Sequence, residues 1–419
     1  MSENIIAGLD VGSTEIRLVV GQHDREDKLQ IIGAVSVPSK GINKGVVKSI
    51  EDVTSSISEC LEKAERLVGV PVTNVWVGIN SPFVRCEKSR GVVAISRSDG
   101  EISQDDIERA LEAARALSVP PNYEIIHVVP VKFIVDNQED IKDPIGMTGV
   151  RLEVVTLIIQ GLSSQIKNLT KAIFRTGLEI DDLVLSPLAA AEAVIGARQK
   201  EIGSALINIG AATTSLAVFE EDELLHTAVI PIGSDHITSD IAIGLRCPIS
   251  LADKIKISFG SANPEKFDAE KQIDIRKIVE EDGSGEETTE ISAKYLAEII
   301  EARVEEIFDK IDQELKKIDR SGMLPGGVFL IGGGTKLADI TDIAKKQLRL
   351  PASLGRNTNI GTIIDKANDT EFLNALGLVA WGDQTKEGTS KGFSLKMPKG
   401  EAFGKVAEKA KKWLQSLMP

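Results

Sequence analysis

Aromatic residues and cysteine are scarce in this 419-residue sequence. Aromatics make up 4% of the chain, so its core must be built mainly from Ile, Leu, Val and Ala. The three cysteines, Cys60, Cys86 and Cys247, are far apart and odd in number, and they form neither a disulfide framework nor a zinc-binding spacing. We therefore expect each of them to be a small, buried apolar side chain, as is usual in a reducing cytoplasm.

Long hydrophobic runs and an excess of basic charge are absent as well. No apolar stretch is long enough to span a bilayer, and the first ten residues lack the pattern of a signal peptide. The formal net charge of −14 argues against nucleic acid as the main partner. With 42% hydrophobic and 27% charged residues, the composition is that of a soluble globular protein, and its length predicts two or more domains.

Residues 5–21 read as two apolar strands joined by a tight Gly-Ser-Thr turn, which predicts a β-hairpin. Asp10 ends the first strand, Gly12 lets the backbone approach a ligand, and Ser13 and Thr14 add hydroxyls beside the turn amides. Such a turn can hold phosphate oxygens with its N–H groups while the carboxylate addresses a metal ion or water. Taken alone, an ordinary hairpin with a polar turn is the better interpretation.

Residues 203–219 repeat this design, with Asn208 at the end of the first strand, Gly210 in the turn, and Thr213 and Thr214 after it. We interpret the repeat as an internal duplication.

A third glycine-rich turn lies at residues 327–337, where an apolar strand runs into Gly332, Gly333 and Gly334, with a helix expected next. A strand that leads through glycines to a helix N-terminus is a natural contact for an anion or a nucleotide.

The remaining pattern alternates strands and amphipathic helices. We expect strands at 29–37, 70–79, 91–95, 125–135, 151–159, 178–185 and 224–232, and helices at 50–69, 103–117, 163–176, 187–199, 234–244, 250–259, 291–318 and 372–382. Residues 260–290 are polar and acidic, which indicates a mobile loop or hairpin and not core. Residues 383–400 have the composition of a flexible linker.

Residues 402–418 form one helical stripe of apolar residues flanked by lysines, in an otherwise acidic chain. A basic amphipathic helix with a tryptophan, held on a linker, is typical of a surface membrane anchor. The alternative is a helix that docks on the protein's own body. The residues expected to contact lipid are Phe403, Val406, Lys409, Lys412, Trp413, Leu414 and Leu417.

In this order, the motifs LDVGST, SPLAAAEAV, LRCPISLADKIKISFG and FLIGGGTKLADI resemble those of the FtsA family of bacterial cell-division proteins, in the actin/Hsp70-like ATPase superfamily. The resemblance covers nearly the whole chain. It implies a two-domain α/β actin-like fold, with duplicated ribonuclease-H-like cores, an FtsA-type inserted α+β subdomain and a C-terminal amphipathic helix. The implied divisions are a first core domain (1–81, with 163–200 and about 365–382), the insert (82–162), a second core domain (201–235, with about 310–364), a smaller subdomain (236–309), the linker (383–400) and the membrane-targeting helix (401–419).

The resemblance also implies a function. The protein would bind ATP and Mg²⁺, polymerise with itself on the cytoplasmic face of the inner membrane at the division site, and tether FtsZ filaments there. Its partners would be FtsZ, anionic lipid and other division proteins that bind the insert. The matching nucleotide-binding positions are Asp10, Gly12, Ser13 and Thr14 in the first phosphate motif, Gly210, Thr213 and Thr214 in the second, Asp253 and Lys256 on the helix toward the ribose and adenine, and Gly332, Gly333, Gly334 and Lys336 in the adenosine motif; Asp10 would hold Mg²⁺ through water.

The second phosphate motif departs from the family pattern. Asn208 replaces the Mg-facing aspartate, Ala211 and Ala212 replace glycines, and Ser215 replaces a closing aspartate.

The first motif has also lost a cation. Its usual lysine position holds Glu15, and strand alternation places Arg17 on the same face. Phosphoryl transfer depends on positioned cations and a metal, so we predict weak or absent hydrolysis and assign no catalytic residue. The alternative is tolerated variation, with Asn208 still holding a metal-bound water.

Two other functions share this fold: an actin-like adaptor of the PilM type, and an active ATPase or kinase. The amphipathic C-terminal stretch favours the FtsA type over PilM. A kinase needs a catalytic acid near the cleft, and none follows from Asn208, Ser186 or Ser215.

Overall fold

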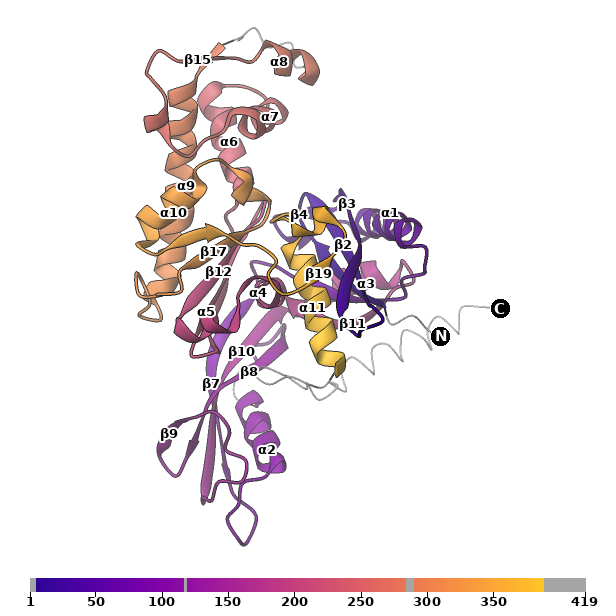
Figure 1. Cartoon of the computed structure of the whole chain (residues 1–419), viewed down its shortest axis with the longest axis vertical. Coiled ribbons are helices and arrows are strands. Elements are labelled where there is room, and N and C mark those ends of the chain that lie inside the picture. Colours follow the sequence, from indigo (N-terminus) through magenta and orange to yellow (C-terminus); the bar gives the residue numbers. More distant parts are fainter. Residues whose placement is uncertain (1–4, 117–118, 284–289, 388–419) are drawn as a thin grey trace, which may run out of the picture.

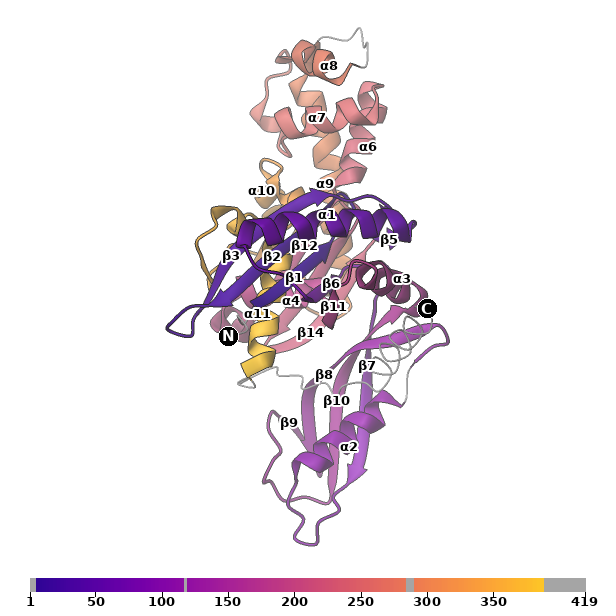
Figure 2. The same cartoon turned by 90° about the vertical axis from the view of Figure 1, so that its right-hand side faces the viewer.

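The computed structural model describes residues 5–116, 119–283 and 290–387 (Figure 1). Two α/β units lie side by side at the centre of an elongated molecule, with a helical subdomain at one end and a sheet-rich subdomain at the other (Figures 1 and 2). All the residues expected to contact lipid, and the amphipathic helix that carries them, lie outside the described residues.

The first unit is built on a sheet with the strand order β11-β6-β1-β2-β3-β19. Strands β1 (Ile5–Val11), β2 (Glu15–His23) and β3 (Leu29–Pro38) form an antiparallel meander, which confirms the hairpin predicted at residues 5–21. Strands β6 (Asn74–Ile79) and β11 (Glu179–Leu185) add in parallel on the other side of β1, and β19 (Gly361–Thr362) pairs with β3 at the edge.

The second unit is built on the sheet β14-β13-β12-β17-β18. Strands β12 (Ser204–Ile209), β13 (Thr214–Glu220) and β14 (Glu223–Ile230) form the antiparallel part, and β17 (Val328–Ile331) and β18 (Ala352–Leu354) pair in parallel beyond β12. Apart from β19, the two sheets have the same order and the same strand directions. This confirms the predicted internal duplication.

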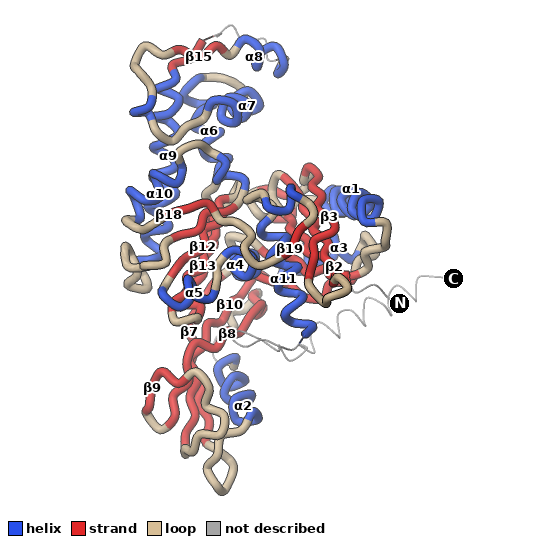
Figure 3. The backbone as a smooth tube through the Cα atoms, in the orientation of Figure 1, coloured by secondary structure: helices blue, strands red, loops and turns tan. Residues whose placement is uncertain are grey.

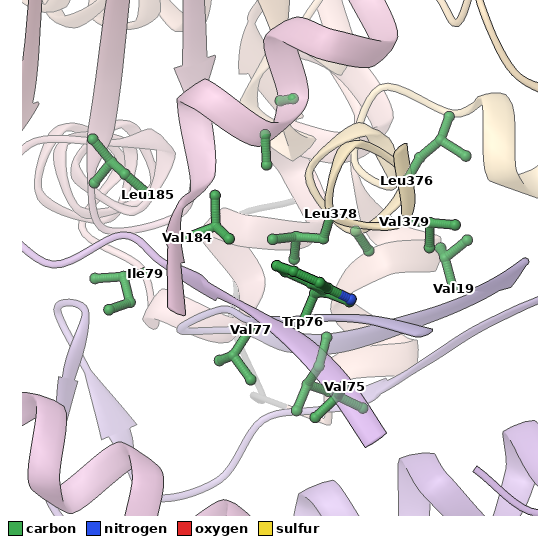
Figure 4. Packing of buried hydrophobic residues seen from close by; sticks show 14 of the residues in the cluster. Val19, Val75, Trp76, Val77, Ile79, Val184, Leu185, Leu376, Leu378 and Val379 are labelled. Atoms are coloured by element: carbon green, nitrogen blue, oxygen red, sulfur yellow. The ribbon is translucent and has the colours of Figure 1, made fainter. Parts of the chain in front are cut away.

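Two helices pack tightly against each other in the first unit: α4 (Ser186–Val194) and α11 (Leu373–Glu387). The alanines of α4 are fully buried, as expected for close helix packing. A Cβ on Gly377 of α11 would lie 2.2 Å from the carbonyl oxygen of Ala189, so only glycine fits there. On the same helix, Leu378 faces Trp76 of β6 in the core (Figure 4).

The helix predicted at 187–199 is two helices in the structure, so that prediction is wrong. Helix α4 ends at Val194, and α5 (Ala197–Ile202) starts after a break at Ile195 and Gly196. Ile195 is extended and 2% exposed, because it packs into the core of the first unit.

The other helices of the first unit are α1 (Ile50–Val68) and α3 (Ser163–Phe174), which pack on each other. The short hairpin of β4 (Ile42–Asn43) and β5 (Val46–Val47) precedes α1.

The sheet-rich subdomain has the strand order β7-β10-β8-β9, all antiparallel, and is covered by helix α2 (Gln104–Arg115) (Figure 3). Its strands are β7 (Arg85–Ala94), β8 (Tyr123–Val135), β9 (Gln138–Ile141) and β10 (Arg151–Leu162). Helix α2 starts with a capping box at Ser103, in which Asp106 accepts the Ser103 backbone N–H at 2.9 Å. Strand β7 starts six residues before the predicted position, and β9 was not predicted because its sequence, QEDI, is mostly polar.

The helical subdomain consists of α6 (Ser234–Leu245), α7 (Ile249–Phe259), α8 (Arg276–Asp282) and the long α9 (Ala293–Lys316). Residues 260–290 are more ordered than predicted: β15 (Gln272–Asp274) pairs with β16 (Glu290–Ser292), and Val279 of α8 is buried in the core. The two strands pair antiparallel with α8 between them, so the described part of this segment is not a simple hairpin, and the expectation that it contributes nothing to the core is wrong. Helix α10 (Ile340–Leu348) packs on α9.

Helix α11 continues to Glu387, so the flexible linker predicted from residue 383 starts too early. The Asp383 carboxylate contacts Nε2 of His23 at 2.6 Å, which fixes this last described turn to β2. No helix among the described residues is long and apolar enough to cross a membrane. Cys60 is buried and Cys86 and Cys247 are partly buried, all as free thiols, in line with the sequence.

The chain crosses between the two units twice, and the crossings touch each other. It leaves the first unit after α4 and returns to it after β18. Near these points Thr358 N–H donates to the Ala193 carbonyl at 3.1 Å, and the Asn359 amide donates to the Glu192 carbonyl at 2.9 Å.

Candidate functional site

A cavity of about 990 Å³ lies between the two units. Its walls are the turns of both hairpins, the glycine turn after β17, the start of α11, and helices α6 and α7. Of the predicted nucleotide-binding residues, Asp10, Gly12, Ser13, Thr14, Gly210, Thr213, Asp253, Lys256, Gly332, Gly333, Gly334 and Lys336 line it, and Thr214 does not. The fold therefore gathers three turns, the first and last of which are more than three hundred residues apart in sequence. The volume is at the upper end of the range for small-molecule sites, about 300–1,000 Å³.

The two hairpin turns are closed in the same way. The Gly12 N–H donates to the Glu15 carbonyl at 3.0 Å, and the Gly210 N–H donates to the Thr213 carbonyl at 2.9 Å. A Cβ on Gly12 would lie 2.6 Å from the Glu15 oxygen, so this turn requires glycine. The shared geometry explains why the two segments look alike in sequence.

The alanines of the second turn are compatible with its backbone. Ala211 and Ala212 both line the cavity, and neither has a positive φ, so their methyl groups add no backbone strain. At the equivalent positions the first turn has Ser13 and Thr14, so the second turn lacks their hydroxyl groups.

Thr214 faces away from the cavity, and the predicted contact through this residue is corrected. Its hydroxyl donates to the Ile232 carbonyl at 2.8 Å, and the residue is fully buried. Neighbouring side chains on a strand point to opposite faces, so only Thr213 can line the cavity. A pair of threonines in the sequence does not reveal which one points inward.

The glycine turn packs directly on the second hairpin. Gly332 has φ +92°, and a Cβ there would lie 2.4 Å from Oδ1 of Asn208. A Cβ on Gly334 would lie 2.6 Å from Cγ2 of Ile209, whereas Gly333 has its nearest such atom at 3.9 Å. The turn thus leaves one backbone position, Gly333, open toward the cavity.

The sequence predicts a helix directly after the three glycines, and this prediction is wrong. The Thr335 hydroxyl donates to the Gly332 carbonyl at 2.7 Å, and residues Gly333–Lys336 form a 3-10 turn. Helix α10 starts only at Ile340, so its N-terminus does not belong to the site.

Asp10 lies on the cavity floor with an exposed fraction of 6%. Burial raises the pKa of its carboxyl, and the charge of Arg17 and a hydrogen bond from Asn374 act in the opposite direction. The Asn374 amide donates to Oδ2 of Asp10 at 3.3 Å. Its own Oδ1 is buried and has no hydrogen-bond partner among the described residues.

The sequence did not identify Asn374. The only signal was a polar residue within the apolar stretch at the start of the predicted helix 372–382. Asn374 brings a free amide oxygen to the floor, close to Asp10 and to the cavity.

Each cation that lines this cavity is paired with a carboxylate. Arg17 contacts Glu15 at 2.5 Å and Glu371 at 3.6 Å, which confirms that Arg17 and Glu15 share a face. The ammonium of Lys336 also contacts Glu371, at 3.0 Å. Glu371 is a second residue that the sequence did not identify.

Helices α6 and α7 form the far wall through a small polar network. Lys256 contacts Asp253 at 2.7 Å and the Thr238 hydroxyl at 2.6 Å, so the two predicted residues of α7 act together. Asp235 of α6 also lines the cavity, and burial raises the pKa of its carboxyl while Lys256 lowers it. Asp235 and Thr238 were not predicted.

The residues present fit a nucleotide with a hydrated magnesium ion. The described residues hold no cluster of three or more His, Cys, Asp or Glu side chains that could bind a metal on their own. Magnesium, however, is usually held by one or two carboxylates together with phosphate oxygens and water. Asp10, the unpaired Oδ1 of Asn374 and the backbone at Gly333 offer the required oxygen ligands and a close backbone approach.

Comparison with known protein families gives two matches. Residues 83–160 match the family described as "SHS2 domain inserted in FTSA", and residues 205–377 match "Cell division protein FtsA". The chain is 36% identical to the cell-division protein FtsA of Borreliella burgdorferi, over 99% of this chain and 98% of that protein. It is 33% identical to the FtsA of Pseudomonas aeruginosa, again over 99% and 98% of the two chains.

Among solved structures, a PilM-PilN type IV pilus biogenesis complex matches 90% of this chain and 98% of its own, with a TM-score of 0.66 and 17% identity. MreB5 of Spiroplasma citri bound to ADP matches 92% of this chain and 99% of its own, with a TM-score of 0.54 and 13% identity. At these identities the likeness concerns the fold alone. It confirms the predicted two-domain actin-like α/β fold with an inserted subdomain.

Proposed function

The chain belongs to the FtsA family of cell-division proteins, and we propose that it binds ATP with Mg²⁺ and uses this to control assembly at the membrane. It polymerises with itself on the cytoplasmic face of the inner membrane at the division site and tethers FtsZ filaments there. It hydrolyses ATP weakly or not at all. The single observation that supports nucleotide binding best is the meeting of two identically closed turns and a glycine turn in one cavity.

In this proposal the phosphates lie between the two hairpin turns. The N–H groups and hydroxyls of Gly12, Ser13 and Thr14 bind them from one side, and Gly210 and Thr213 from the other. The ribose and adenine lie toward Asp253, Lys256 and the glycine turn with Lys336. A protein of the same fold, the MreB5 of Spiroplasma citri, is described as bound to ADP.

Weak hydrolysis follows from the charges around the cavity. When bound, Mg²⁺ supplies positive charge that neutralises the phosphates. Asp10 orients its water shell, and Asn208 offers an amide where a second carboxylate is usual. Arg17 and Lys336 are already paired with Glu15 and Glu371, so neither is free to stabilise new negative charge. The site therefore holds a triphosphate better than it cleaves one.

The membrane contact is assigned to residues 401–419, beyond a linker that starts after the end of α11 at Glu387 and not at residue 383. Phe403, Trp413 and Leu417 would enter the lipid interface, and Lys409 and Lys412 would meet anionic headgroups. The insert, residues 82–162, is the proposed contact for other division proteins. These divisions of the chain, including the two core domains and the subdomain 236–309, are part of the proposal.

Sedimentation tests the proposal. The full chain is centrifuged with and without ATP and Mg²⁺, and with and without vesicles that contain anionic lipid. We expect ATP-dependent pelleting that vesicles increase, and loss of vesicle binding when residues 402–419 are deleted. Vesicle binding that survives this deletion would contradict the anchor. Mg²⁺-dependent phosphate release at the rate of an ordinary ATPase, about 1–100 s⁻¹ by comparison with kinases, would contradict weak hydrolysis.

A further inference from the structure

A second cavity, of about 300 Å³, adjoins the first at its phosphate end. The two cavities share Ser13, Ala212, Asp235 and Ser239. The smaller one is completed by His236 of α6 and by the turn between β4 and β5, from which Lys44 contributes. Ser13 and Ala212 belong to the turns of the two hairpins, so this cavity begins where a chain of phosphates would end.

The β4–β5 turn is held against the first hairpin and lies close to the second. The Gly45 N–H donates to the Ser13 hydroxyl at 3.0 Å, which holds the turn against the first hairpin. A Cβ built on Gly45 would lie 3.1 Å from the Asn80 carbonyl and 3.5 Å from Cγ2 of Thr213, in the second hairpin. The turn is therefore bonded to the first hairpin turn and lies close to the second, and the residue before Gly45 lines the cavity between them.

Lys44 differs from the cations of the large cavity in its pairing. Those cations all contact carboxylates: Arg17 contacts Glu15 and Glu371, Lys256 contacts Asp253, and Lys336 contacts Glu371. Lys44 is exposed and forms no ion pair within residues 5–116, 119–283 and 290–387. The groups that face it from α6 are Asp235 and His236, whose Nδ1 accepts the Gly233 N–H.

Turn geometry does not account for a lysine at this position. Lys44 and Gly45 both have positive φ, 51° and 69°, as the two central residues of a tight hairpin turn do. At such positions asparagine and glycine are favoured over residues with long side chains. Turn geometry alone therefore does not explain a lysine here, whereas a ligand for its ammonium group would explain it.

We propose that Lys44 binds the terminal phosphate of a nucleoside triphosphate and so distinguishes the triphosphate from the diphosphate. This rests on the proposed binding of ATP between the two hairpins. The ammonium supplies the positive charge that the first hairpin lacks, because its usual lysine is Glu15 and Arg17 is paired. Since the β4–β5 turn is bonded to the first hairpin turn and lies close to the second, the contact also favours the arrangement in which the two hairpins face each other.

The test compares two ligands on four full-length proteins: the wild type, Lys44→Asn, Lys44→Arg and Lys48→Asn. Asparagine removes the charge and suits the positive φ, so the turn is preserved. Lys48 is an exposed lysine next to the same hairpin that lines neither cavity, and it controls for a general loss of charge. The affinities for ADP and for AMPPNP, a triphosphate that resists hydrolysis, are measured by calorimetry with Mg²⁺ present.

We expect Lys44→Asn to weaken AMPPNP binding about tenfold, the usual effect of losing a hydrogen bond to a charged group, with ADP changed less than about twofold. Lys44→Arg should keep the preference for the triphosphate, and Lys48→Asn should change neither affinity. Equal losses for both ligands in Lys44→Asn, or no loss at all, would overturn the role of Lys44 while leaving ATP binding intact. A wild-type chain that binds neither ligand would instead refute the proposed function, and this inference with it.

Discussion

The side-chain amide of Asn374 donates a hydrogen bond to the carboxylate of Asp10, at 3.3 Å, across 364 positions of sequence. Asp10 lies near the end of β1, and Asn374 lies in α11, the last described helix. The bond therefore ties α11 to the floor of the cavity, where Asp10 is proposed to orient the water around Mg²⁺.

Replacing Asn374 tests whether this hydrogen bond supports Mg²⁺-dependent nucleotide binding. In Asn374→Leu the carboxylate of Asp10 loses its only side-chain hydrogen bond among the described residues, and its pKa rises further. Because hydrogen bonds to charged groups contribute roughly 1.5–3 kcal/mol, we expect Mg²⁺-dependent nucleotide affinity to fall about tenfold or more. The nucleotide affinity of the variant and of the wild type is measured by calorimetry, once with Mg²⁺ and once with EDTA. An equal loss under both conditions would mean that Asn374 does not act through Asp10.

We expect the buried carboxyl of Asp10 to destabilise the ligand-free protein at neutral pH. Its folded pKa lies above the unfolded value, so the folded state binds a proton more readily. Asp10 contributes favourably to the free energy of unfolding only at low pH. This contribution is lost as the pH rises from about 4 through the pKa of the folded state. We expect Asp10→Asn to unfold at a higher temperature than wild type at pH 7 without ligand, and to lose Mg²⁺-dependent nucleotide binding.

Asp182 is the matched control for that experiment. Burial raises the pKa of its carboxyl from an ordinary value of 3.8 to about 6, and Asp182 does not line the cavity. A tenfold change in proton affinity corresponds to about 1.4 kcal/mol, so the folded protein should lose up to roughly 3 kcal/mol between pH 4 and pH 7 because of this group. Asp182→Asn should remove that pH dependence, measured by urea unfolding, and leave nucleotide binding unchanged. A flat difference between variant and wild type across this range would contradict the prediction.

Two neighbouring glycines should respond differently to the same substitution. In Gly334→Ala the new methyl would lie 2.6 Å from Cγ2 of Ile209, inside the packed core, so we expect lower stability. In Gly333→Ala the nearest such atom is 3.9 Å away, so the protein should keep its stability while the methyl enters the cavity and weakens nucleotide binding. Thermal unfolding and nucleotide titration separate the two effects. A stable Gly334→Ala would show that the turn shifts freely away from β12.

Restoring the carboxylate at position 208 should raise hydrolysis. Asn208 and aspartate have nearly the same shape, and Asn208 is 2% exposed on the cavity wall. With Mg²⁺ bound, a second carboxylate would be accommodated and would orient the water shell. We expect Asn208→Asp to release phosphate faster than wild type by about tenfold, less than the roughly 10²–10⁴-fold that a positioned general acid or base contributes. The control is the same assay without Mg²⁺, in which the variant should gain nothing. An unchanged rate with Mg²⁺ would mean that the missing carboxylate is not the cause of weak hydrolysis. The ion pair between Arg17 and Glu15 would then be the next cause to test.

The sequence predicted the parts of the site whose chemistry is local. The hairpins at Asp10 and Asn208 and the turn at Gly332 were recognisable because strand alternation and glycine requirements act over a few residues. Their meeting in one cavity followed only from the family resemblance.

What the sequence missed depends on contacts between distant segments. The break at Gly196 depends on how Ile195 packs into the first core, and the orientation of Thr214 depends on its hydrogen bond to Ile232. Asn374 and Lys44 reach the cavity only because α11 and the β4–β5 turn are brought there by the fold. Residue spacing along one element contains no information about such placements.

The two touching crossings between the units limit how the units can move. Two separate connections would allow twisting and sliding, but these are bound together by hydrogen bonds from Thr358 to Ala193 and from Asn359 to Glu192. We therefore expect any movement between the units to be mainly a rotation about that edge, which would leave both sheets intact. Gly45 is bonded to Ser13 and lies close to Thr213, so a rotation of this kind would change the separation of the two hairpins, and we expect open and closed forms of this protein to differ mainly in that separation.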